Sequence, residues 1–105
     1  MSTLYSVSFL ALEESTDVTP VGVPAGETWV IRDIDVYWGN QIEAPTGRIL
    51  GSAGQAFAIW QGAVLAPNVM SWRGRHVITG PGTLTASVDV GNADISISGY
   101  RLTAP

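Results

Sequence analysis

Alternation of apolar and polar residues along the chain predicts β-strands throughout. In residues 83–90 every second residue is apolar, from Leu84 to Val90, and the residues between them are polar. A period of two is typical of a strand with one face on a core and the other in water. No segment shows a sustained 3.6-residue period with caps, so essentially no helix is expected. This pattern predicts strands at 4–12, 21–23, 28–38, 48–50, 55–60, 69–78, 83–90 and 95–102.

The segment Val23–Trp38 is the one around which the other predicted strands are arranged. Pro24, Ala25 and Gly26 predict a tight turn, since proline presets φ and glycine accepts a positive φ. Arg32 falls on the apolar side of the strand that follows, so either its stem lies along the core edge or a β-bulge shifts the register there. Alternation places Val30, Ile34, Val36 and Trp38 on the core face, and Asp33, Asp35 and Tyr37 on the opposite face.

Turn residues recur every eight to twelve positions, which is the spacing of a β-sandwich or barrel. Gly91–Asp94 predicts a hairpin that pairs 83–90 with 95–102, whereas Glu13–Thr19 and Gly39–Gly47 predict exposed loops. Gly74 predicts a bulge or a close approach of another backbone. The sequence therefore predicts a single all-β domain over residues 1–105, an antiparallel, jelly-roll-like β-sandwich of about eight short strands.

Composition excludes several classes of protein. The chain has 105 residues and a formal charge of −4, which argues against nucleic-acid binding because phosphate contacts need a basic patch. It has no cysteine, so disulfides and thiolate metal sites are excluded. No apolar run approaches the roughly 18 residues of a membrane-spanning helix, and the apolar start lacks the basic residues of a secretion signal. We expect no membrane insertion.

Few residues are candidates for catalysis. His76 is the only histidine and no G-x-S-x-G motif accompanies it, so a structural or surface histidine is expected. Asp33 and Asp35 lie on one strand face about 7 Å apart, a spacing that two catalytic carboxylates or a calcium site could use. The favoured interpretation is an outer face whose carboxylates pair with arginines across the sheet. We predict no catalytic residue, no metal and no cofactor.

Aromatic and basic residues are the better candidates for binding. Trp72, Arg73 and Arg75 surround Gly74, and tryptophan and arginine are the residue types that dominate binding hot spots. The alternative is that Trp72 packs on the sheet and that the arginines form ion pairs with Asp33 and Asp35. Four tryptophans are many for so small a core, so at least one is expected at a subunit interface. The residues predicted to contact a partner or a glycan are Trp60, Trp72, Arg73, Arg75 and Tyr37.

Three segments carry a resemblance to a known group of proteins. They are V-P-A-G-E-T-W-V-I-R-D-I-D-V-Y (Val23–Tyr37), W-R-G-R-H-V (Trp72–Val77) and D-I-S-I-S-G-Y-R-L-T (Asp94–Thr103). In this order they resemble small virion proteins of tailed bacteriophages that infect actinobacteria, often labelled minor tail proteins. The resemblance implies a non-enzymatic β-sandwich built into a phage particle as a homo-oligomer, and it transfers no active-site residue.

The leading hypothesis is therefore a tail-associated structural protein of a virion, made in the bacterial cytoplasm, which contacts other virion proteins and itself, as a trimer or higher oligomer. A capsid decoration protein is the alternative within the same class. A carbohydrate-binding module that attaches to a host-surface glycan through Trp60, Trp72 or Tyr37 is the alternative from another class. An enzyme ranks third, after the virion protein and the carbohydrate-binding module.

Overall fold

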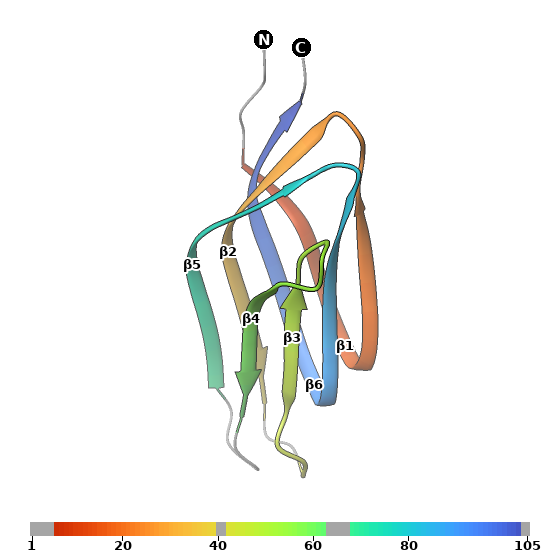
Figure 1. Ribbon diagram of the computed structural model, residues 1–105. Helices are drawn as coiled ribbons and strands as arrows, with labels where there is room; N and C mark the ends of the chain where they lie inside the picture. Colours follow the sequence, from red (N-terminus) through yellow and green to blue (C-terminus); the bar gives the residue numbers. More distant parts are fainter. Residues whose placement is uncertain (1–5, 40–41, 63–67, 104–105) are drawn as a thin grey trace.

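Strands account for nearly all of the chain that the computed structural model describes, which is residues 6–39, 42–62 and 68–103 (Figure 1). The side chains of residues 6, 7 and 10–17 are not part of this description, and the first two residues of the predicted strand 4–12 lie outside it. The all-β prediction is confirmed. The six strands are β1 (Ser6–Val23), β2 (Glu27–Trp38), β3 (Thr46–Leu50), β4 (Ala56–Gln61), β5 (Asn68–Thr79) and β6 (Gly82–Thr103).

The strands form two antiparallel sheets because β1 and β6 each contribute to both. The β5 sheet has the order β5, β2, second half of β6, first half of β1, and the β4 sheet has the order β4, β3, first half of β6, second half of β1. The chain passes between the sheets at every connection except the β3–β4 hairpin. This is the connectivity of a jelly roll, as the sequence predicted.

Two predicted interruptions of the strands are wrong. Glu13–Thr19 is not a loop, because β1 continues through it and pairs with β6 on both sides of a register shift between Ser15 and Asp17. Gly91–Asp94 is not a hairpin, because the two halves of β6 pair with β1 rather than with each other. Gly91 has φ of 78°, which lets the strand bend from one sheet into the other. The folded ribbon of β1 and β6 is visible in Figure 1.

The core lies between the sheets and is built from aliphatic side chains and tryptophans. Ile31, Ile34 and Val36 of β2 are fully buried there, together with Ile49 of β3 and Ile97 of β6. The register of β2 shifts between Ile31 and Asp33 against both neighbours, so the predicted bulge at Arg32 is present. It reverses the faces before it: Trp29 and Ile31 join the core cluster, whereas Val30, which alternation placed there, is buried as predicted, with 7% exposure, but is not part of that cluster.

The turns follow the glycines and prolines of the sequence. At Pro24–Gly26 the Glu27 amide donates to the Pro24 carbonyl over 3.2 Å, and Gly26 has φ of 86°. The loop before β3 ends at Pro45, because β3 already includes Gly47; positions 40 and 41 of this predicted loop lie outside the description. Within the described ranges, no helix is long and apolar enough to cross a membrane.

Candidate functional site

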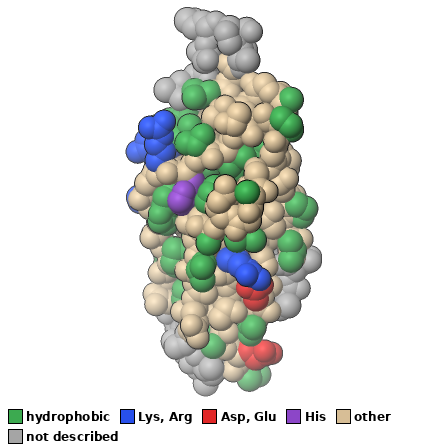
Figure 2. Space-filling model, in the orientation of Figure 1, with side chains coloured by type: hydrophobic (Ala, Val, Ile, Leu, Met, Phe, Trp, Pro, Cys, Tyr) green, Lys and Arg blue, Asp and Glu red, His purple; other side chains and the backbone are tan. Residues whose placement is uncertain are grey.

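An aromatic stack joins the edge strands of the two sheets. The imidazole of His76 on β5 lies between the rings of Phe57 on β4 and Trp72 on β5, with centroid distances of 4.1 Å and 4.3 Å and interplanar angles of 6° and 7°. Its Nε2 lies 3.1 Å from the Phe57 carbonyl oxygen. Figure 2 shows the imidazole at the surface, next to hydrophobic side chains. His76 thus has a packing role, which is the structural role expected for it.

Gly74 allows this stack to form. A Cβ at Gly74 would lie 2.7 Å from Cζ2 of Trp72, so the indole occupies the space that any other residue would fill. Gly74 also lies at an irregularity of the sheet, since Ile31 pairs with His76 whereas Asp33 pairs with Arg73. The predicted bulge is therefore present, but the group that approaches Gly74 closely is a side chain.

The two aspartates of β2 are held by one arginine. Arg73 Nε lies 3.0 Å from Asp33 Oδ1, and Arg73 Nη2 lies 2.9 Å from Asp35 Oδ1. Ser71 Oγ donates to the same oxygen of Asp35 over 2.8 Å. This is the cross-strand pairing that the sequence favoured over a calcium site or a pair of catalytic carboxylates. All three charged side chains are substantially exposed, so the pairs add little to folding stability.

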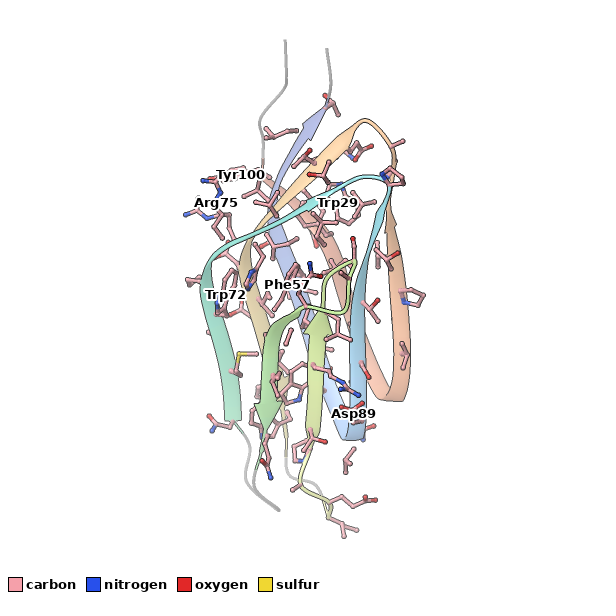
Figure 3. All side chains as sticks on the ribbon, viewed as in Figure 1. Trp29, Phe57, Trp72, Arg75, Asp89 and Tyr100 are labelled. Atoms are coloured by element: carbon pink, nitrogen blue, oxygen red, sulfur yellow. The ribbon has the colours of Figure 1, made fainter. Side chains whose placement is uncertain are left out.

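These pairs lie at the centre of the outer face of the β5 sheet, which is the candidate functional surface. One end of this face, here the basic end, carries Arg32, Arg75, Val77 and Tyr100. The Arg32 guanidinium carbon lies 5.9 Å from the centre of the Tyr100 ring. Val77 is 48% exposed, and Figure 3 shows Arg75 and Tyr100 at the same end of the molecule, at the upper left. Arg75 has no ion pair with a described residue.

The opposite end of the same face, here the acidic end, is hollowed. Asp35, Tyr37, Val69, Asp94 and Ser96 line an open depression of about 490 Å³ there. Tyr37 and Val69 are 49% and 52% exposed, and they are direct neighbours across the β2–β5 pairing. Tyr37 also pairs with Asp94 of β6. An apolar hollow with carboxylates at its border suits a cation that has an apolar stem.

The predicted contact residues divide into three groups. Tyr37, Arg73 and Arg75 share the outer face of the β5 sheet, whereas Trp72 points inward and belongs to the edge stack. Trp60 is 3% exposed in the core, which corrects the expectation that its ring offers a contact surface. Trp29 and Trp38 are buried too, so one small core does hide three of the four indoles, and the tryptophan count no longer indicates an interface.

Several members of the outer face were not predicted. Asp94, Val69, Val77 and Tyr100 come from β5 and β6, and Arg32 comes from the bulge of β2. Alternation along β5 separates Arg73, Arg75 and Val77 from Trp72 and His76, so the sequence could predict which residues of this strand share a face. It could not predict the register between strands, because no residue pattern shows that Asp94 pairs with Tyr37.

Comparisons with known proteins give little beyond this geometry. No family model matches the sequence, and no curated protein matches it either. A chain in the structure of infectious bursal disease virus, Gx strain, aligns with a TM-score of 0.39 and 12% identity, over 98% of this chain and 32% of that one. The chain thus spans about a third of the length of that protein, and a TM-score of this size does not establish a shared fold.

Among the described residues no three His, Cys, Asp or Glu side chains form a group that could hold a metal ion.

Proposed function

We propose that this protein is a non-enzymatic structural subunit of a tailed-bacteriophage virion, tail-associated, and that it assembles with further copies of itself and with other virion proteins. The observation that carries the proposal is the outer face of the β5 sheet. It combines exposed apolar residues at both ends with an ion-paired centre, which is the composition of a docking surface.

The three residues that the sequence offered as catalytic candidates have other partners. Asp33 and Asp35 share Arg73, and His76 is fixed between two aromatic rings with its Nε2 against a backbone carbonyl. A general base must instead reach the proton of a substrate in an open site. The segments Val23–Tyr37, Trp72–Val77 and Asp94–Thr103, which resemble phage virion proteins, supply most of β2, the stacked part of β5 and the second half of β6. The resemblance therefore runs through the β5 sheet itself.

Proteomics of purified particles tests the proposal. Particles of the phage or prophage that encodes the chain are banded on a density gradient, and the protein is quantified in the particle fraction and in the free fraction of the lysate. We expect co-purification with the particles at a fixed ratio to the major capsid protein. Abundant protein in the lysate with none in the particles would contradict the proposal. Immunogold labelling of the tail supports the tail assignment, and labelling of the head shell supports a capsid decoration protein instead.

Carbohydrate binding is tested in the same system. The ring of Tyr37 is the exposed aromatic group of the predicted glycan contacts, since Trp60 is buried and Trp72 is stacked. Pull-down with host cell-wall fragments, comparing the wild type with Tyr37→Ala, distinguishes the two functions. Binding that Tyr37→Ala abolishes would favour a carbohydrate-binding module. Equal retention of the two proteins favours the structural role.

A further inference from the structure

We propose that the outer face of the β5 sheet docks onto the same face of a second copy, with the strands of the two copies running in opposite directions, so that Arg32 and Arg75 of each copy enter the hollow at the acidic end of the other. This inference rests on the proposed function. It specifies which surface the copies of the proposed homo-oligomer use and how they are oriented. The occupant of the hollow is thus an arginine pair from an identical chain.

Charge is the first argument for a second copy. The outward side chains of β2, β5 and the second half of β6 that the structure describes include three arginines and three aspartates, whereas the chain as a whole has a formal charge of −4. The charges are also separated along the strands. Asp33, Arg73 and Asp35 pair at the centre with a net charge of −1. Arg32 and Arg75 lie at one end, and Asp94 lies at the other, where Asp35 also borders the hollow. A face with this arrangement is complementary to itself when one copy is reversed.

The spacing of the two ends fits a two-fold axis. Asp94 and Tyr100 are six positions apart on β6, which is about 20 Å at roughly 3.4 Å per residue. The midpoint of this span is at Ile97, whose partner on β2 is Ile34, next to the Arg73 pairs. An axis that lies between the two faces and crosses the strands at this level brings each basic end over the acidic end of the partner. An axis parallel to the strands would bring like charges together, which is unfavourable.

The shape of the acidic end suits an arginine side chain. The hollow is walled by Tyr37 and Val69, with Asp35 and Asp94 beside it. An arginine stem can lie along these apolar side chains while its guanidinium stacks on the tyrosine ring and pairs with a carboxylate. Arg73 and Ser71 both contact Oδ1 of Asp35. At the other end, Val77 and Tyr100 supply the apolar surface that accompanies the incoming arginines.

The area of the face sets the expected strength. Three strands about 4.8 Å apart and some eight residues long give a flat area of about 400 Å² per copy, or about 800 Å² for the pair, which is below the roughly 1,200 Å² at which stable interfaces begin. We therefore expect a weak dimer in isolation, with a dissociation constant of about 10 to 100 µM that rises with salt. In a particle, where copies are held close together, the effective concentration exceeds this value.

Charge exchange between two variants tests the geometry. Arg32→Glu/Arg75→Glu makes the basic end acidic, and Asp94→Arg makes the acidic end basic. Each variant alone should dimerise at least about tenfold more weakly than the wild type, because both contacts of a symmetric dimer become repulsive. An equimolar mixture should form a heterodimer within about threefold of the wild-type constant, since both contacts are then attractive. Analytical ultracentrifugation in low salt, with one variant fluorescently labelled, measures all three.

A matched control lies on the other sheet. Arg48→Glu makes the same type of change at an exposed arginine of β3, whose Nε lies 3.5 Å from Asp89 Oδ2, and it should leave the dimer unchanged. Circular dichroism and thermal unfolding confirm that each variant is folded. Three results would each overturn the docking geometry. The wild type could be a monomer at 500 µM, the charge-exchange variants could dimerise as well as the wild type, or the mixture of the two variants could fail to associate.

These outcomes are independent of the particle experiment. If the swaps leave association unchanged while the chain still co-purifies with particles, the docking face is wrong and the virion role stands. If the mixture restores the dimer but the chain is absent from particles, the docking face stands and the virion role is wrong.

Discussion

The two faces of the β5 sheet use alternate residues of the same strands for different purposes. The inner face presents Ile34, Val36 and Ile97, all of which are fully buried, and the outer face presents charged, aromatic and exposed aliphatic side chains. Substitutions on the inner face should therefore change the free energy of unfolding, whereas those on the outer face should change association. The comparison shows that neighbouring residues in the sequence can have separate physical roles when strand geometry directs them apart.

The largest effect is expected from a cavity on the inner face. Ile34→Ala removes three carbons from a fully buried side chain, and we expect it to lower the free energy of unfolding by about 3 to 4 kcal/mol. Val77→Ala on the outer face of the same sheet is the matched control and should cost less than about 1 kcal/mol. Urea denaturation measures both. Equal losses for the two variants would mean that the outer face is also a core.

The aromatic stack at the sandwich edge should have an intermediate effect. Trp72→Ala removes one ring of the stack with His76, and we expect a loss of about 2 to 3 kcal/mol, below the range for a fully buried tryptophan. Trp72→Phe keeps a ring against the imidazole and should recover at least half of this loss. Denaturation of both variants gives the comparison. If Trp72→Ala were neutral, the stack would not hold the edge strands together.

Substitution of Gly74 tests whether the Trp72 indole requires a residue without a Cβ at position 74. Gly74→Ala should destabilise the protein by about 1 kcal/mol, because Trp72 must shift away from the new methyl group. In a Trp72→Ala background the same substitution should be neutral or stabilising, which a double-mutant cycle detects as a coupling energy. Gly22→Ala is the control, since nothing lies within 4 Å of a Cβ built there. Additive effects of the two substitutions would disprove the close approach.

The smallest effect on folding is expected from the ion pairs at the centre of the outer face. Arg73→Ala should cost less than about 1 kcal/mol, because its pairs with Asp33 and Asp35 are exposed to solvent. The difference from the wild type should shrink further in 1 M salt. Denaturation at low micromolar protein, where dimers are absent, measures it, with Arg48→Ala for comparison. A loss above 2 kcal/mol would show that the outer face contributes to folding after all.

Alternation predicted most of the fold, and backbone irregularities account for the errors. A period of two placed strands close to their observed positions, but one extra residue at Arg32 exchanges the faces of β2 before it. Alternation therefore misses Trp29 and Ile31, which belong to the core cluster, and places Val30 in that cluster although it is buried outside it. The Gly91–Asp94 segment predicts a turn because glycine often closes hairpins. A glycine that bends a continuous strand has the same sequence signal, and only the pairing with β1 distinguishes the two.

The candidate site was predictable only in part. The pairing of Asp33 and Asp35 with an arginine followed from their position on a polar strand face. The hollow did not, because it needs Tyr37, Val69 and Asp94 side by side, and these residues come from three strands whose register the sequence leaves open. Trp60 was chosen by residue type, and residue type does not reveal burial.

Pairing of β6 with β1, β2 and β3 has a consequence for the synthesis of the protein. Residues 82–103 lie between β1 on one side and β2 and β3 on the other, and all three of these strands are translated earlier. A chain released before residue 82 therefore lacks the strand that joins β1 to both sheets, so neither sheet is complete and apolar sides of its strands remain in water. Truncated products should therefore be degraded rather than incorporated. Quality control of the assembly is in this way built into the order of the strands, since only a chain that has been translated through β6 can offer a finished surface to its neighbours.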